Sequence, residues 1–128
     1  MKQSHRGRKG AGKLILVIDD DGRILRFTKM SLEMVGYAVI AASNGSEALK
    51  LAATARPDIV LLDLSLPVMD GFQVLSRLRA VSSVPVIAFS AHTSAAARAL
   101  ELGADRFLAK PFRPEELLDL IVTLLEKG

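Results

Sequence analysis

The sequence contains no cysteine and no tryptophan, and only 5% of its residues are aromatic. Without cysteine, disulfide bonds and thiolate metal sites are excluded. Half of the residues are nevertheless hydrophobic, so the core must be built mainly from leucine, valine, isoleucine and alanine. Such a core is typical of an α/β protein, in which parallel strands covered by helices on both faces are continuous apolar runs.

Long hydrophobic runs are also missing. No apolar run approaches the roughly 18 residues that a membrane-spanning helix requires. The basic start followed by the apolar stretch 14–18 has only a faint likeness to a signal peptide, because that stretch is short and leads directly into three aspartates. We therefore expect no membrane contact and a cytoplasmic location.

The formal net charge of +3 has its origin at the N-terminus. Residues 1–13 hold five basic residues and no acidic ones, which leaves twelve basic against fourteen acidic residues in the remainder. The segment has no apolar periodicity, so we predict a disordered basic tail over 1–13 and a single domain over 14–128. The tail is compatible with contact to nucleic acid or to an acidic partner, but a short basic run is a weak motif and we favour a solvated extension. We expect no direct nucleic-acid binding by the domain itself.

Apolar runs alternate five times with segments of helical character along residues 14–128. Gly36 suits a position just past a helix end, and Pro114 suits the first turn of the last helix. The predicted strands are 14–18, 37–42, 59–62, 86–89 and 106–108. The predicted helices are 23–35, one ending near 56, one ending near 80, 94–102, and one that starts at 114. This alternation predicts right-handed crossovers and one parallel sheet covered on both faces.

Charged residues follow three of the predicted strands. Asp19, Asp20 and Asp21 come after the first strand, Asp63 ends the third, and Lys110 follows the fifth. The carboxyl ends of parallel strands are where sites form in open sheets. Clustered carboxylates raise one another's pKa unless positive charge offsets them. A divalent cation and the lysine would do so, and the arrangement suits an aspartate that accepts a phosphoryl group.

Four segments resemble the receiver domain of two-component response regulators, and in particular the chemotaxis regulators. These segments are the acidic opening 16–21, the acceptor strand and loop 57–71, the hydroxyl-bearing strand 85–91 and the lysine–proline end 103–112. They occur in the order and at the spacing of that family and cover essentially all of 14–128. The resemblance implies a flavodoxin-like (βα)5 fold with three layers and a five-stranded parallel sheet of strand order 2-1-3-4-5.

The resemblance also implies a reaction. Asp63 would take a phosphoryl group from a phosphohistidine on a sensor kinase or phosphotransfer protein. Mg²⁺, or Mn²⁺, would be bound by Asp20 and Asp63, by Asp19 directly or through water, and by the backbone carbonyl of Ser65. Lys110 would pair with phosphoryl oxygens. Such a domain catalyses its own phosphorylation and dephosphorylation and has no conventional turnover.

A conformational switch is the third implication of the resemblance. Ser90, where threonine is common, would hydrogen-bond the phosphoryl group, and Phe107, where tyrosine is common, would change rotamer. The change would alter the surface of the fourth helix, fifth strand and fifth helix for an unknown downstream partner or a phosphorylation-dependent dimer. Ser65 and His92 flank the site and leave the phosphoryl lifetime open. The Lys110–Pro111 bond is a candidate cis peptide.

Several residues have simpler interpretations. Asp58 and Asp70 are expected in turns or caps, and Asp21 is equally compatible with a cap of the first helix and with the site. His92 is interpreted as an exposed loop residue and not as a base. The methionines Met30, Met34 and Met69 are expected to be packing residues.

Two other functions compete with this hypothesis. The run 19–22 resembles the start of haloacid-dehalogenase-type phosphatases, with Asp19 as nucleophile and Asp21 as acid/base, but this leaves Asp63 unexplained. A receiver-shaped interaction module that is never phosphorylated is the other, although such modules typically lack the acidic pair, the acceptor or the lysine. We expect no output domain within this sequence, which leaves open a stand-alone regulator or a piece of a larger protein.

Overall fold

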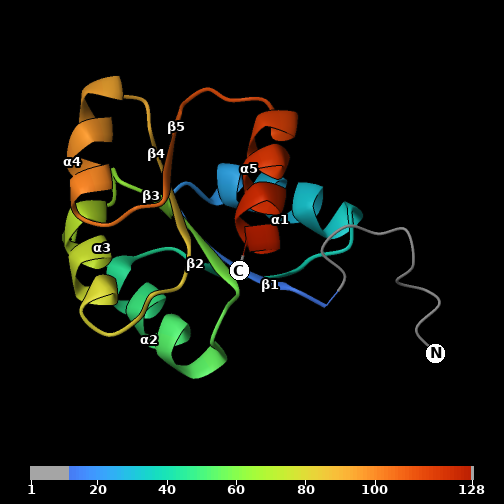
Figure 1. Ribbon diagram of the computed structural model, residues 1–128, viewed down its shortest axis with the longest axis horizontal. Helices are drawn as coiled ribbons and strands as arrows, with labels where there is room; N and C mark the ends of the chain where they lie inside the picture. The colour runs from blue at the N-terminus through green and yellow to red at the C-terminus, as the bar shows by residue number, and fades with distance from the viewer. Residues whose placement is uncertain (1–11, 128) are drawn as a thin grey trace.

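Five parallel strands alternate with helices in a computed structural model, which describes residues 12–127 (Figure 1). The strands are β1 (Leu14–Ile18), β2 (Ala38–Ala42), β3 (Ile59–Asp63), β4 (Val86–Ser90) and β5 (Arg106–Ala109). The helices are α1 (Gly22–Met34), α2 (Gly45–Ala55), α3 (Gly71–Arg79), α4 (Ala96–Glu101) and α5 (Pro114–Lys127). The predicted disordered tail lies almost entirely outside the described residues.

The sheet order is β2-β1-β3-β4-β5, with every neighbouring pair parallel. This confirms the flavodoxin-like order 2-1-3-4-5. Figure 1 shows α1 and α5 on one side of the sheet and α2, α3 and α4 on the other. The two sides have separate buried cores, because successive side chains of each strand point to opposite faces.

Helix starts are fixed by side-chain caps at the positions where the sequence supplies them. Asn44 accepts a hydrogen bond from the backbone N–H of Glu47 at the start of α2. Asp70 and Gln73 form a capping box at the start of α3, which confirms the predicted capping role of Asp70. Asp21 caps α1 by accepting from the backbone N–H groups of Arg23 and Ile24.

The predicted helix 94–102 differs from the observed structure. A 3₁₀ turn, η2 (Thr93–Ala95), precedes a six-residue α4. Neither His92 nor Ala95, at the two N-cap positions, makes a side-chain capping bond. Without a capping side chain, the first N–H groups of a helix have no side-chain partner, and 3₁₀ turns are frequent at such helix starts.

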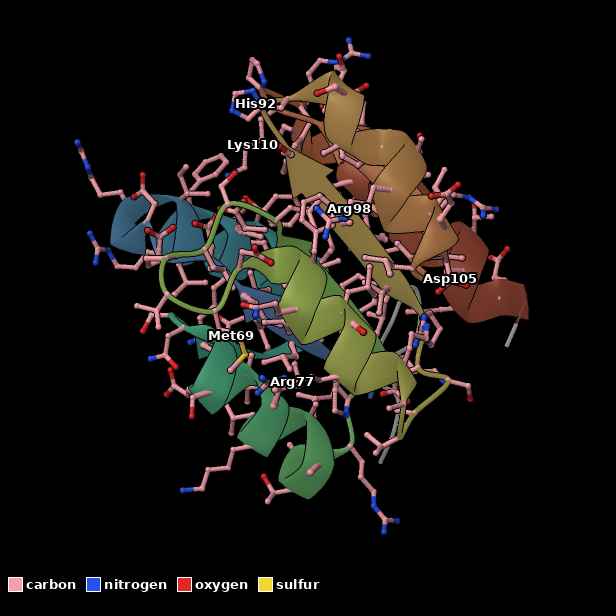
Figure 2. All side chains as sticks on the ribbon, turned by 90° about the vertical axis from the view of Figure 1, so that its left-hand side faces the viewer. Met69, Arg77, His92, Arg98, Asp105 and Lys110 are labelled. Atoms are coloured by element: carbon pink, nitrogen blue, oxygen red, sulfur yellow. The ribbon has the colours of Figure 1, made fainter. Side chains whose placement is uncertain are left out.

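The prediction that Met30 and Met34 are packing residues is wrong. Their exposed fractions are 61% and 80%, because the buried face of α1 is occupied by Thr28 and Leu32. Met69 does pack against a core, as predicted. Figure 2 shows Met69 next to α2, and a Cβ added at Gly45 would lie 2.9 Å from its sulfur.

Candidate functional site at the carboxyl edge of the sheet

The fold brings Asp19 and Asp63 together through the register of two neighbouring strands. Ile18 of β1 pairs with Leu62 of β3, so the next residue on each chain is an aspartate. Alternation along the strands turns both aspartates toward the side of the sheet that α1 and α5 cover. The predicted meeting of acidic side chains at this edge is therefore observed.

One carboxylate oxygen from each of Asp19, Asp20 and Asp63 lies within 4.8 Å of the others. Asp19 and Asp63 are 1% and 3% exposed, whereas Asp20 is exposed. One oxygen of Asp19 accepts from the backbone N–H of Asp21 at 2.9 Å. Its Oδ2 is buried and has no hydrogen-bond partner among the described residues. A buried oxygen without a donor, beside two other carboxylates, fits a hard divalent cation such as Mg²⁺.

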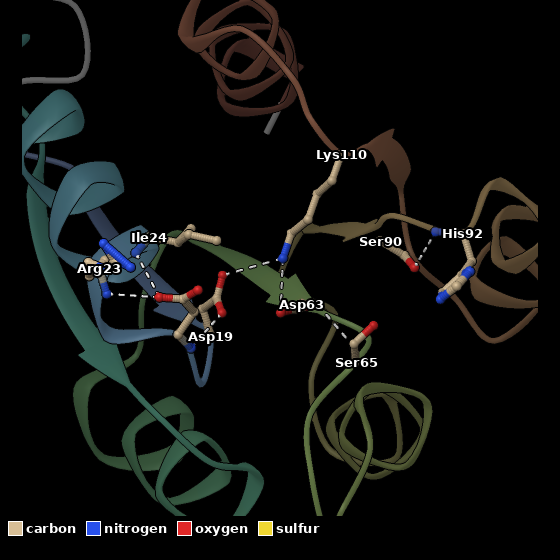
Figure 3. A network of polar contacts seen from close by, with 9 residues as sticks. Asp19, Arg23, Ile24, Asp63, Ser65, Ser90, His92 and Lys110 are labelled. Carbon is tan, nitrogen blue, oxygen red and sulfur yellow. Dashed lines mark hydrogen bonds and ion pairs between the residues drawn. The ribbon is translucent and has the colours of Figure 1, made fainter.

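Lys110 supplies positive charge to this cluster. Its Nζ lies 3.1 Å from Oδ2 of Asp63 and 3.6 Å from Oδ2 of Asp19, and Figure 3 shows the side chain reaching across to both. The other oxygen of Asp63 accepts from the backbone N–H of Ser65 at 3.0 Å. Both oxygens of Asp63 are thus held in place. The metal-binding role of the Ser65 carbonyl stays a prediction.

Burial raises the pKa of Asp19 from 3.8 to about 6. The hydrogen bond from the Asp21 backbone opposes this shift, the charge of Asp63 adds to it, and Lys110 opposes it. Desolvation therefore outweighs the favourable contacts at this carboxyl. A cation placed against Asp19 would remove the penalty, which is a second reason why the cluster fits a metal.

Ser90 and Phe107 lie on the other face of the sheet from the two buried aspartates. Ser90 ends β4 and is buried, and its Oγ accepts from the backbone N–H of His92 at 3.0 Å. Phe107 pairs with Ala88, two residues before Ser90, and packs half-buried against the core under α2, α3 and α4. Within the described residues, the Ser90 hydroxyl has no hydrogen bond to the acidic cluster.

The remaining residues named in the sequence analysis either stabilise the fold or lie at the surface. Asp21 is the N-cap of α1, which favours its interpretation as a helix cap over its interpretation as a site residue. Asp58 accepts from the backbone N–H of Leu14 at 2.7 Å and so ties the start of β3 to β1. His92 is exposed, as predicted. The Lys110–Pro111 peptide bond is cis, as predicted.

The sequence analysis did not single out Phe89, which precedes Ser90. Its ring centroid lies 5.1 Å from Nζ of Lys110. Phe112 meets the same ring edge-on, with centroids 5.7 Å apart. Phe89 looked like one more apolar residue of a buried strand, and only its pairing with Asp63 in the register could have marked it.

Comparisons with known proteins give a consistent result. The model of the family described as "Response regulator receiver domain" matches residues 15–122. The transcriptional regulatory protein KdpE of Mycobacterium tuberculosis is 48% identical over 107 residues, which are 82% of this chain and 47% of KdpE. The probable transcriptional regulator ycf27 of Porphyridium aerugineum is 43% identical over 115 residues, 88% of this chain and 48% of that protein. The chain spans about half the length of these curated relatives.

Solved structures resemble the chain over most of its length. The receiver domain of the Francisella response regulator 1452 has a TM-score of 0.82 and 36% identity, and the match covers 90% of this chain and 97% of that one. A CheY-like receiver domain protein from Methanospirillum hungatei has a TM-score of 0.84 and 31% identity, covering 90% and 94%. The family match includes all five strands except Leu14, the first residue of β1.

Proposed function

The chain belongs to the response regulator receiver domain family, and on that basis we propose that Asp63 is the phosphoacceptor of a two-component system. The observation that carries the proposal is the geometry of one carboxylate. Asp63 is almost fully buried, its Oδ2 is 3.1 Å from the ammonium of Lys110, and it shares a cluster with Asp19 and Asp20. A carboxylate held in this way is oriented toward a donor before the donor arrives.

The proposed step is a displacement at phosphorus. One Oδ atom of Asp63 attacks the phosphorus of a phosphohistidine, and the new O–P bond forms while the P–N bond breaks. The electron pair of that bond goes to the imidazole, which takes up a proton, so the products are an aspartyl phosphate and a free histidine. Water returns the carboxylate by attacking the same phosphorus, with Asp63 as the leaving group.

The residues around Asp63 have separate tasks in this proposal. Asp19, Asp20 and Asp63 would hold the divalent cation, which supplies charge neutralisation to the phosphoryl oxygens when it is bound. Lys110 contributes a second positive charge from the end of β5. Asp19 can bind the cation only when its carboxyl is ionised.

We further propose that the signal leaves through the other face of the sheet. Ser90 would bond a phosphoryl oxygen, and Phe107 would respond on the same face, next to α4 and β5. A sensor kinase or phosphotransfer protein is the proposed phosphoryl donor. The proposed downstream partner of the phosphorylated chain is an unknown protein or a second copy of the same chain. We place these reactions in the cytoplasm. Among the described residues, no helix is long and apolar enough to span a membrane.

The test of the proposal is the intact mass of the protein after incubation with acetyl phosphate and Mg²⁺. We expect one phosphoryl group on the wild type, none on Asp63→Asn, and none when EDTA replaces Mg²⁺. Asp58→Asn is the matched control, because that acid bonds Leu14 at the opposite end of β3. A labelled Asp63→Asn would refute the acceptor, and an unlabelled wild type under conditions that label a known receiver would favour an inactive module.

A further inference from the structure

We propose that the ring of Phe89 positions Lys110 for its contact with the phosphoryl group on Asp63. The inference rests on the proposed function, because it concerns the lysine that would meet that group. The side chain of Phe89 has no polar atom that could bond the phosphoryl group, so its proposed role is that of a positioning residue.

The order of the strands makes this contact necessary. Lys110 follows β5 and Asp63 ends β3, and β4 lies between these two strands. The lysine side chain must therefore cross β4 to reach Asp63. On the face that holds the buried aspartates, the residue of β4 in register with Asp63 is Phe89. Whatever side chain stands at this position is the surface over which the lysine passes.

The backbone fixes both ends of this crossing. The N–H of Lys110 donates to the carbonyl of Ser90 at 2.9 Å, and the N–H of Leu64 donates to the carbonyl of Phe89 at 3.0 Å. These bonds hold the base of the lysine beside β4 and hold β4 beside the acceptor strand. Phe89 is 2% exposed and packed edge-on by Phe112, so its ring has little freedom to turn away.

An aromatic ring suits this position for an electrostatic reason. A ring face attracts a cation that lies within about 6 Å of its centroid, and the ammonium of Lys110 is at 5.1 Å. The ring is neutral, so it attracts the ammonium without competing with Lys110 for the phosphoryl oxygens. An aliphatic side chain would fill the same space without this attraction.

The experiment compares ring removal with ring retention. Phe89→Met removes the ring at similar volume, and Phe89→Leu is a second such variant in case the first does not fold. Phe89→Tyr keeps the ring. Ile87→Val is the control, because Ile87 is fully buried on the same face of the same strand, two residues before Phe89.

We measure the initial rate of phosphorylation by acetyl phosphate, the Kd for Mg²⁺, and the proton shifts of the Lys110 ε-methylene. We expect the rate to fall about 2- to 30-fold in Phe89→Met or Phe89→Leu, the change that a cation–π contact corresponds to. Phe89→Tyr and Ile87→Val should keep the wild-type rate. The ε-methylene signal, shifted by the ring in the wild type, should move toward its unshifted value only when the ring is removed. Mg²⁺ binding should not weaken.

Three results would overturn the inference while the proposed function stands. They are a wild-type rate in the ring-removed variants, an equal loss of rate in Ile87→Val, and a loss of Mg²⁺ affinity as large as the loss of rate. The last two would mean that Phe89 only maintains the packing of this face. If the wild type itself took no phosphoryl group, the proposed function would fail and the inference with it.

Discussion

At the scale of single residues, the buried carboxyl of Asp19 links the site to the stability of the fold. Its pKa is raised from 3.8 to about 6, chiefly by burial. A carboxyl with a raised pKa binds its proton more tightly in the folded state than in the unfolded state. Folding is therefore opposed by ionisation of Asp19, with no penalty below about pH 4 and the full penalty above about pH 6.

Asp19→Asn should consequently stabilise the metal-free protein at pH 7.5. The amide can still accept from the backbone of Asp21, while the desolvated charge is gone, and we expect a gain of about 1–3 kcal/mol in the free energy of unfolding. At pH 4 the gain should largely disappear. Urea denaturation in EDTA at the two pH values measures this, with exposed Asp20→Asn as the control. Destabilisation of equal size at both pH values would contradict the argument.

Val68, in the loop between β3 and α3, has a backbone conformation that lowers the stability of the fold. It is fully exposed and has a φ of 64°, in a region that β-branched residues rarely adopt. Val68→Asn should raise the free energy of unfolding by about 1 kcal/mol, since asparagine tolerates this conformation better. Val81→Asn is the matched control, because Val81 is also an exposed valine but is not among the residues with positive φ. A gain of the same size at Val81 would show that polarity, and not backbone strain, is responsible.

At the scale of elements, α4 is the most weakly anchored helix of the described chain. It has six residues, no side-chain cap, and one buried residue, Ala99. Arg98 holds it to α3 by lying 4.2 Å from the ring centroid of Phe72, and Figure 2 shows Arg98 between the two helices. Elements with few buried contacts open locally at lower free energy than the core.

Hydrogen exchange followed by NMR should therefore show faster exchange in α4 than in α3, which starts with a capping box and has four buried residues. Arg98→Ala should accelerate exchange in α4 further and leave α3 nearly unchanged. Arg106→Ala, in the neighbouring β5, is the control. Equal protection of the two helices in the wild type would refute this ranking.

How far the sequence predicts the structure also differs from element to element. All five strands were predicted within about a residue, because buried parallel strands are continuous apolar runs between clear turn residues. The meeting of Asp19, Asp63 and Lys110 followed from the strand order. The same apolar runs do not reveal which face a residue occupies, so the relation of Phe89 to Lys110 was missed. Helical spacing alone also failed to separate exposed Met30 and Met34 from packing residues.

At the scale of the whole molecule, the proposed acceptor and the proposed switch residues occupy opposite faces of one sheet. Asp63 faces α1 and α5, whereas Ser90 and Phe107 face α3 and α4. In the proposed mechanism, the effect of phosphorylation would cross from one face to the other at the carboxyl end of β4, where Ser90 carries a hydroxyl group.

Ser90→Ala should separate the two events. We expect it to be phosphorylated by acetyl phosphate, because Asp63 and Lys110 are untouched, but to lose most of the amide shift changes over α4 and β5. Two-dimensional NMR before and after phosphorylation measures this, and Ser90→Thr, which retains the hydroxyl, should respond as the wild type does. Full shift changes in Ser90→Ala would rule out the hydroxyl as the link.

The alternation of side chains along β3 has a consequence for how this gene product can vary. Losing a single residue between Ile59 and Leu62 would leave the aspartate in the chain but turn it toward α2 and α3, away from Asp19 and Lys110. An in-frame deletion of one codon there would thus break up the cluster as completely as a replacement of Asp63. Aligned by sequence alone, such a variant would still display every acidic residue of the site.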